Sequence, residues 1–205
     1  MRRLPDITAP GLRLLFVGIN PSLHSAAAGH HFASAGNPFW RLLHASGFTP
    51  SLLRPEEDHR LLDFGLGLTN GCARPTGAAC EISRSEQSRG TRLLMRRIEE
   101  LRPEFVALLG LTLYRAVFPR GDEPGPGLKT GRLAGARTFV LPNPSGRNQA
   151  YPGFDKKLVW FRQLSEAVRP PPDGGLASST PDLPPSDPAR RASPPPRSSQ
   201  PFRRA

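Results

Sequence analysis

The sequence is poor in cysteine, and this shortage excludes several classes of protein. Only Cys72 and Cys80 occur among 205 residues, which is too few for a disulfide scaffold and fits a reducing compartment. Two thiols also fall short of the four that hold an iron–sulfur cluster, and no His-x-x-x-His spacing completes a zinc site around them. We therefore expect two free cysteines, no metal and no cofactor.

Long apolar runs are absent as well. No stretch reaches the ~18 to 20 apolar residues that cross a bilayer. The N-terminal segment MRRLPDITAPG lacks the continuous apolar core of a secretory signal. The sequence predicts a soluble, cytoplasmic protein that does not enter a membrane.

Acidic residues are scarce relative to basic ones. The chain has 28 Lys and Arg against 17 Asp and Glu, a formal net charge of +11, and the segment from residue 170 onward holds only five Arg against three Asp. Most of the positive charge therefore belongs to residues 1–169. Such a surface attracts nucleic acid, acidic lipid or acidic protein, and does not by itself specify one of them.

Residues 170–205 differ in composition from the rest of the chain. They are rich in Pro, Ser, Gly and Arg and contain almost no large apolar residue, so they cannot bury enough surface to offset the entropy of ordering. We expect one domain over residues 1–169 and a disordered tail over residues 170–205. A basic arm that contacts phosphates is the alternative, and its candidate residues are Arg190, Arg191, Arg203 and Arg204.

Short apolar runs alternate with helical patterns in the first 169 residues. The runs have strand length and stop at turn-forming residues, whereas the helical patterns place apolar residues three and four apart. The alternation predicts a three-layer α/β/α domain with a central, mainly parallel sheet of four or five strands. The expected strands are residues 12–18, 64–70, 105–110 and 137–142, and the expected helices are residues 39–47, 90–101, 112–118 and 154–168.

Three of these strands end in asparagine. Asn20, Asn70 and Asn143 each follow or end a predicted strand, and ligands of open parallel sheets bind outside the carboxyl ends of the strands. Amides suit the orientation of a water molecule, and Phe32 offers a flat face on which a nucleobase can stack. The plainer alternative for each residue is a turn former or, for Phe32, a core side chain.

Other motifs that carry chemistry are incomplete. The segment GPGLKTG at 125–131 lacks the Gly-Lys-Ser/Thr of a phosphate loop. Ser145 is not in a Gly-x-Ser-x-Gly elbow because Asn143 occupies the first glycine position. We expect the adjacent His30 and His31 to be solvated loop residues rather than metal ligands.

Several motifs in chain order resemble one family. Gly18-Ile19-Asn20-Pro21-Ser22-Leu23, followed by Gly29, Phe32, Asn37 and Phe39-Trp40, is similar to the first motif of the mismatch-specific uracil DNA glycosylases, the bacterial relatives of thymine DNA glycosylase. Asn143-Pro144-Ser145-Gly146 is similar to the second motif. Gly67-Leu68-Thr69-Asn70, Arg74-Pro75-Thr76 and Gly90, which we expect to open the long helix, also fall where the family has similar residues. The resemblance covers residues 12–167.

The resemblance implies a monofunctional DNA glycosylase that hydrolyses the N-glycosidic bond of uracil, or of related damaged pyrimidines, in mismatched double-stranded DNA. Such an enzyme flips the base out of the helix. The resemblance also implies a bacterial protein that acts on DNA as a monomer and needs no cofactor. By resemblance, Asn20 positions the attacking water and Phe32 stacks on the base. The implied base-binding residues are Gly18, Ile19, Pro21, Ser25, Phe32 and Asn70. Asn70 could instead orient a second water or simply end its strand.

The second motif would enter the helix at the place of the missing base. Its implied DNA-binding residues are Asn143, Pro144, Ser145, Gly146, Arg147 and Asn148. Arg147 departs from the bacterial branch, which carries an apolar wedge there, so it either fills the gap or contacts a phosphate. Two rival functions remain: a catalytically inactive module that binds nucleic-acid lesions, and a uracil glycosylase that acts on single strands.

Overall fold

The computed structural model describes residues 4–121, 123–146 and 148–169. The predicted tail at 170–205 and the predicted wedge residue Arg147 lie outside this part of the chain. Within it, five strands form one sheet in the order β2-β1-β3-β5-β4. The first four strands in this spatial order pair in parallel, and β4 pairs antiparallel with β5. The strands are β1 (Leu14–Gly18), β2 (Leu66–Asn70), β3 (Phe105–Leu109), β4 (Gly127–Leu133) and β5 (Ala136–Leu141).

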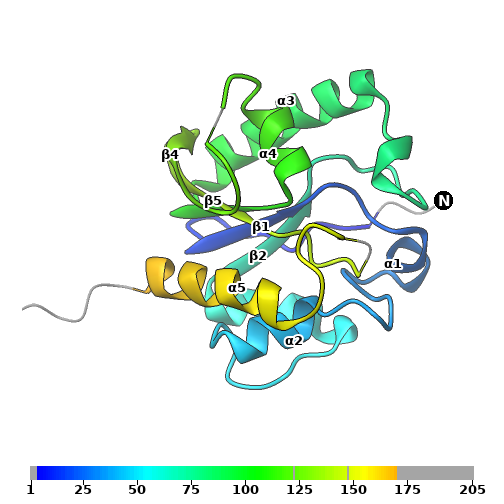
Figure 1. Cartoon of the computed structure of the whole chain (residues 1–205), viewed down its shortest axis with the longest axis vertical. Coiled ribbons are helices and arrows are strands. Elements are labelled where there is room, and N and C mark those ends of the chain that lie inside the picture. The colour runs from blue at the N-terminus through cyan, green and yellow to red at the C-terminus, as the bar shows by residue number, and fades with distance from the viewer. Residues whose placement is uncertain (1–3, 122, 147, 170–205) are drawn as a thin grey trace, which may run out of the picture. The chain divides into compact units, whose positions relative to one another are not determined.

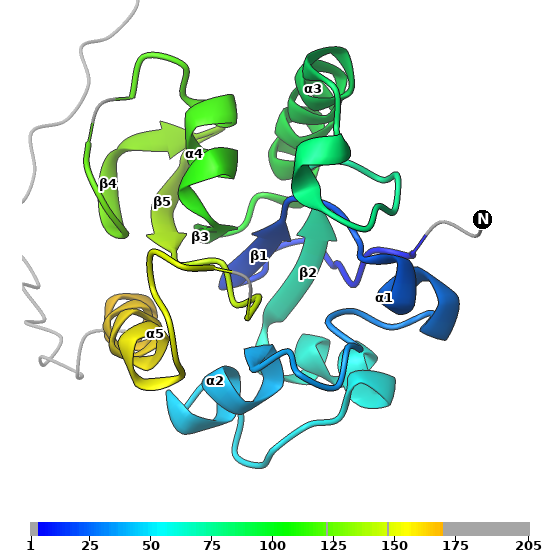
Figure 2. The same ribbon diagram turned by 45° about the vertical axis from the view of Figure 1, so that its right-hand side comes forward.

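Helices cover both faces of this sheet, which confirms the expected three layers. The helices α3 and α4 lie on one face, whereas α2 and α5 lie on the other (Figure 1 and Figure 2). Alternate side chains of a strand reach opposite clusters: Phe16 packs with α2 and α5, while Leu15 and Val17 pack with α3 and α4. The helices are α2 (Phe39–Ala45), α3 (Arg84–Leu101), α4 (Leu111–Val117) and α5 (Asp155–Val168).

The long helix α3 begins six residues before Gly90, so the expectation that Gly90 opens this helix is wrong. Ser83 accepts a hydrogen bond from the backbone nitrogen of Glu86, and the Glu86 carboxylate accepts one from the backbone nitrogen of Ser83. This capping box is visible in the sequence as Ser-x-x-Glu. Gly90 lies inside the helix, where a Cβ would sit 2.2 Å from the carbonyl oxygen of Gly71.

Three short helices have no counterpart among the predicted elements. They are α1 (Leu23–Ala28) and the 3-10 helices η1 (Pro55–Phe64) and η2 (Ala79–Glu81). The N-cap of α1 is Ser22, and its C-cap is Gly29 in the left-handed conformation. Elements this short or this tight do not display a helical period of apolar residues.

The segment GPGLKTG supplies the edge strand β4 rather than a loop that binds phosphate. The Lys129 ammonium donates to the carbonyl oxygens of Pro124 at 3.1 Å and Gly125 at 2.8 Å, so it is used to close the turn before the strand. Among the described residues, no helix is both long and apolar enough to cross a membrane. Cys72 is buried and Cys80 is exposed, and both are free thiols.

Candidate active site

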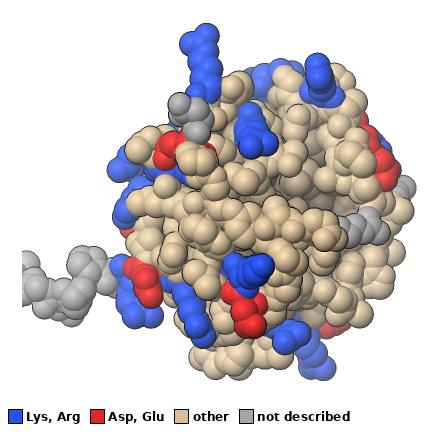
Figure 3. Space-filling model, viewed as in Figure 1, with Lys and Arg blue, Asp and Glu red and all other residues tan. Residues whose placement is uncertain are grey.

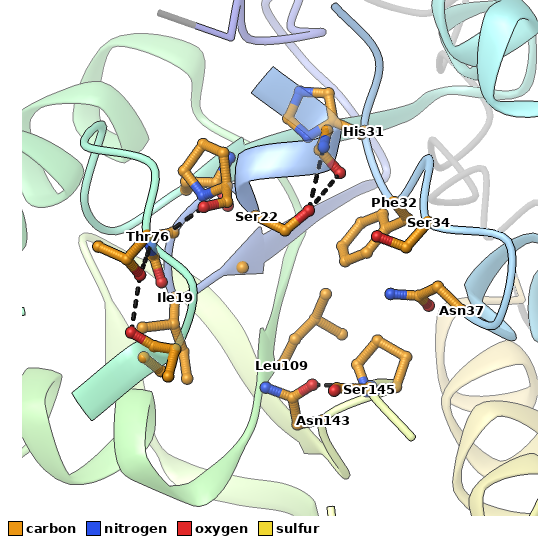
Figure 4. Close-up of a pocket in the computed structure, with 18 of the residues that line it drawn as sticks. Ile19, Ser22, His31, Phe32, Ser34, Asn37, Thr76, Leu109, Asn143 and Ser145 are labelled. Carbon is orange, nitrogen blue, oxygen red and sulfur yellow. Dashed lines mark hydrogen bonds between the residues drawn. The ribbon is translucent and has the colours of Figure 1, made fainter. Parts of the chain in front are cut away.

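A cavity of about 680 Å³ lies at the carboxyl edge of the sheet. Segments that follow β1, β2, β3 and β5 all contribute to its wall, so it brings Asn20, Asn70 and Asn143 together. Figure 4 shows Phe32 and Asn37 on one side, Thr76 on the opposite side, and Asn143 between them. Its volume falls in the ~300 to 1,000 Å³ range of small-molecule sites.

The loops after β1 and β2 are joined by backbone hydrogen bonds beyond the sheet. Gly71 donates to the carbonyl oxygen of Gly18 at 2.8 Å, and Cys72 donates to that of Ile19 at 2.8 Å. Thr76 donates to the carbonyl oxygen of Pro21 at 3.1 Å. The loop that carries Asn20 is therefore held along its whole length by the loop that carries Thr76.

The side-chain amide of Asn20 has one possible orientation. Its nitrogen Nδ2 lies 2.7 Å from the hydroxyl of Thr76 and 3.1 Å from the carbonyl oxygens of both Pro21 and Arg74. The Thr76 hydroxyl donates its own proton to the carbonyl oxygen of Ala78 at 2.7 Å, so it can only accept from Asn20. All three neighbours are acceptors, which places the nitrogen toward them and leaves the oxygen Oδ1 available to a donor.

Two serine hydroxyls form a directed pair in the wall. The Ser22 hydroxyl donates to that of Ser25 at 3.0 Å, and the backbone nitrogen of Ala33 donates to Ser25 Oγ at 3.2 Å. Both acceptor positions of the Ser25 hydroxyl are then used, while its proton is still available. Ser25 is only 3% exposed and lines the cavity, so this proton can serve as a donor to a bound ligand.

Phe32 adopts an unusual backbone conformation beside the cavity. Its φ is 52°, in the left-handed region that is uncommon for a residue other than glycine. The ring stacks on Phe39 with centroids 4.0 Å apart and an interplanar angle of 23°, and the ring lines the cavity (Figure 4). Phe39 thus supports the ring of Phe32 from behind.

His31 is buried, so the expectation of a solvated histidine is wrong for this residue. It is 2% exposed, and its Nε2 lies 2.9 Å from the carbonyl oxygen of Pro5, to which it donates. Its backbone nitrogen donates to the Asp58 carboxylate at 3.1 Å. Burial lowers the pKa of the His31 imidazole and so favours its neutral form, and the residue helps to form the wall of the cavity.

Asn70 lies against the backbone of Gly18. A Cβ at position 18 would come within 2.5 Å of Asn70 Oδ1, so the missing side chain of Gly18 makes room for the Asn70 amide. Within the described ranges, no hydrogen bond is formed by the side chain of Asn70, which lines the cavity and a second, smaller cavity beside it. The amide is free to bind a ligand in either space.

The loop after β5 is ordered by its own asparagines. Asn143 Oδ1 accepts from the backbone nitrogen of Ser145 at 2.9 Å, and Asn148 Nδ2 donates to the carbonyl oxygen of Asn143 at 3.1 Å. Pro144 and Gly146 also line the cavity. The two amides thus shape the second motif into a compact turn at the edge of the cavity.

The composition of the wall limits the chemistry. The described residues that line the cavity include amides, hydroxyls and His31, but no carboxylate, cysteine or lysine. Across the described chain, no group of three His, Cys, Asp or Glu side chains could hold a metal ion. An oriented water molecule is the nucleophile that these side chains can provide, and hydrogen-bond donors can stabilise a leaving group.

Most of the predicted site residues meet in this cavity. Gly18, Ile19, Pro21 and Ser25 line it together with the residues described above. The sequence did not identify His31, Ser34, Thr76, Leu109 and Thr112 as residues of this site. Thr76 belongs to a motif that the sequence analysis noted, but its hydrogen bond to Asn20 was not predicted. The two residues are 56 positions apart, and no local pattern connects them.

The family model of the uracil DNA glycosylase superfamily matches residues 5–168. The fold is also similar to the solution NMR structure of a candidate uracil DNA glycosylase from Methanosarcina acetivorans, with a TM-score of 0.54 and 23% sequence identity. That similarity covers 80% of this chain and 97% of the other. The structural likeness concerns the fold alone, whereas the family match spans most of the chain and supports DNA glycosylase function.

Proposed function

The chain belongs to the uracil DNA glycosylase superfamily, and on that basis we propose that it hydrolyses the N-glycosidic bond of uracil in mismatched double-stranded DNA. The product is an abasic site and a free base. We further propose that it acts as a monofunctional enzyme, as a monomer and without a cofactor, in the cytoplasm of a bacterial cell.

The observation that carries this proposal is the fixed orientation of the Asn20 amide. Because Nδ2 is bound to three acceptors, Oδ1 is available to accept a proton of a water molecule and hold it for attack on the sugar C1′. An amide cannot remove the proton of water in advance, so the bond to the base must break early. Donors that stabilise the departing uracil anion then contribute most to the rate.

Ser25 provides a donor for recognition of the base. Its hydroxyl accepts from Ser22 and Ala33 and has only its own proton left to give. Uracil presents carbonyl oxygens that accept such a proton, whereas the exocyclic amine of cytosine is itself a donor. A hydroxyl that can only donate therefore favours uracil over cytosine when it faces the 4-position of the ring, because the O2 carbonyl is common to both bases.

Stacking and base flipping supply the remaining requirements. We propose that the flipped base lies on the free face of Phe32, since the other face is occupied by Phe39. Extrusion from a duplex costs a few kcal/mol and costs least at a mismatch, which is the physical reason to expect a preference for mispaired uracil. The loop from Asn143 to Asn148 would occupy the helix, with Arg147 filling the gap.

The proposal is tested with labelled oligonucleotides that carry a single uracil. After incubation and alkali treatment, strand scission reports the abasic site. We expect scission in a duplex with uracil opposite guanine and less with uracil opposite adenine. Binding without scission would show an inactive lesion-binding module, and scission confined to single strands would indicate the other branch of uracil glycosylases.

A further inference from the structure

We infer that the ion pair between Arg74 and Glu86, which lies outside the proposed active-site cavity, positions the catalytic amide of Asn20. This inference rests on the proposed role of Asn20. Neither Arg74 nor Glu86 lines the main cavity; both line the neighbouring cavity of about 220 Å³. They are therefore positioning residues that act through another group rather than on the base.

The first link runs from Asn20 to the backbone of Arg74. The Asn20 amide donates to the Arg74 carbonyl oxygen at 3.1 Å. That oxygen is in place only if the loop after β2 holds its conformation. The Arg74 guanidinium fixes this loop, because its Nε and Nη2 donate to the two carboxylate oxygens of Glu86, and Nη2 also donates to the carbonyl oxygen of Glu81 at 2.7 Å. A paired contact of this kind fixes direction as well as distance.

A second link closes a circuit of hydrogen bonds around the same loop. Asn20 donates to Thr76, whose hydroxyl donates to the carbonyl oxygen of Ala78. The backbone nitrogen of Ala78 donates to the Glu81 carboxylate at 2.7 Å, and the Glu81 carbonyl oxygen accepts from Arg74. Removal of the guanidinium opens this circuit at Glu81 and at the same time releases the loop from Glu86.

Glu86 is itself a fixed partner because it belongs to the first turn of α3. Its carboxylate accepts from the backbone nitrogen of Ser83 at 2.9 Å and from the Ser83 hydroxyl at 2.8 Å. The pair thereby ties the loop behind Asn20 to the end of a long helix. The loop that carries Asn20 is thereby held at a fixed position relative to the sheet and α3 while a base enters.

Because the Arg74–Glu86 pair is partly exposed, its loss should affect the position of Asn20 more than the stability of the protein. The side chains of Arg74 and Glu86 are 49% and 34% exposed, and ion pairs this exposed add little to the free energy of unfolding. Loss of the pair is therefore expected to misplace the Asn20 amide without unfolding the protein. Small misplacements of a catalytic group cost up to about 100-fold in rate.

The kinetic test compares the full-length variants Arg74→Ala and Arg74→Lys with the wild type. Single-turnover excision of uracil should fall on the order of 10-fold to 100-fold in Arg74→Ala, while the Kd for duplex DNA stays unchanged. Arg74→Lys should recover only part of the rate, because lysine cannot make the paired contact. The matched control is Arg60→Ala, which removes another partly exposed Arg–Glu pair, with Glu57, and should retain the wild-type rate.

Two outcomes of these measurements overturn the inference. Equal rates in Arg74→Ala and the wild type would show that the pair does not position Asn20. A weaker Kd with an unchanged single-turnover rate would show that Arg74 contacts DNA directly. In the Asn20→Ala background, Arg74→Ala should cause no further loss, since the group through which it acts is already gone.

An NMR measurement decides the inference even if uracil is not the substrate. The side-chain NH₂ signals of Asn20, assigned by their absence in Asn20→Ala, should shift and exchange faster with solvent in Arg74→Ala. They should remain as in the wild type in Arg60→Ala. Unchanged signals in Arg74→Ala would refute the positioning role, whereas absence of uracil excision by the wild type would refute only the proposed function.

Discussion

At the scale of single residues, the proposed chemistry depends on Asn20. Asn20→Ala should reduce single-turnover excision at least about 100-fold, because the attacking water loses the acceptor that orients it. Duplex binding should persist, since the amide is assigned to water and not to phosphate. Rate and Kd are measured on the same uracil duplex, with the exposed amide variant Gln163→Ala as the matched control. Parallel loss of rate and binding in Asn20→Ala would contradict this assignment.

Ser25 tests the recognition of the base at the same scale. Ser25→Ala removes a neutral donor worth about 0.5 to 1.5 kcal/mol, so we expect kcat/KM for uracil to fall by up to roughly 10-fold. Steady-state kinetics with the uracil duplex measures this, and Ser51→Ala, at an exposed serine, is the control. Full activity of Ser25→Ala would exclude the hydroxyl from base recognition.

The sequence identified the chemical types of these residues better than their contacts. Amides at the ends of strands and a nearby aromatic ring were enough to predict where Asn20, Asn143 and Phe32 would meet. The orientation of the Asn20 amide depends instead on Thr76 and Arg74, which belong to a different loop. Contacts between such distant positions leave no local pattern, and the burial of His31 was missed for the same reason.

At the scale of elements, the packing of α3 against the loop after β2 sets the position of that loop. Gly90→Ala would place a Cβ 2.2 Å from the Gly71 carbonyl oxygen. Such overpacking costs about 1 to 3 kcal/mol and exceeds the gain of up to ~1 kcal/mol from alanine in a helix. We expect a lower urea midpoint for Gly90→Ala. Ser88→Ala, at an exposed position of the same helix, should retain or raise the midpoint, and equal behaviour of the two variants would contradict this packing.

The buried strands and the long helices could be predicted because each has a simple pattern of apolar residues, either a continuous run or a helical spacing. Buried strands such as β1 and β3 are continuous apolar runs, and α5 repeats its apolar residues at helical spacing. The edge strand β4 alternates between buried and exposed positions and contains two glycines, so it was not recognised. The short helix α1 depends on its caps rather than on a period, and its existence could not be inferred from patterning.

At the scale of the whole molecule, three carboxylates make stability depend on pH. Hydrogen bonds from Arg74 lower the pKa of Glu86 to about 2. Hydrogen bonds donated by the backbone nitrogen of Arg54 and by the Thr130 hydroxyl lower the pKa of Glu57 and Glu123, respectively. Because the folded pKa values lie below the ordinary value of 4.5, this contribution is present above pH 4.5 and is lost as the pH falls toward 2.

Thermal unfolding measured between pH 7 and pH 2 checks this expectation, with Tm falling below about pH 4.5. In Glu86→Gln the fall of Tm below about pH 4.5 should be less steep, because glutamine cannot take up the proton that the glutamate binds in the unfolded chain. An identical fall of Tm in the variant would assign the acid sensitivity to other groups. The effect of each carboxylate should be modest, since solvent screens such exposed pairs.

The positive net charge of the chain indicates the kind of partner it binds and does not determine its fold. Figure 3 shows Lys and Arg side chains around a broad uncharged area on one face, with fewer acidic side chains among them. This distribution suits a polyanion that is held at its edges. The disordered tail predicted for residues 170–205 lies outside the described chain and stays a prediction, and the family match ends before it, at residue 168.

Repair by this protein requires that loops from separate strands form one cavity that holds a single extruded pyrimidine. A crystal structure of Asn20→Ala bound to a duplex with uracil opposite guanine tests this requirement. We expect the uracil inside the cavity, stacked on Phe32, with the turn from Asn143 to Asn148 against the opened helix. A uracil still paired within the helix, or a duplex bound to another face of the protein, would contradict it.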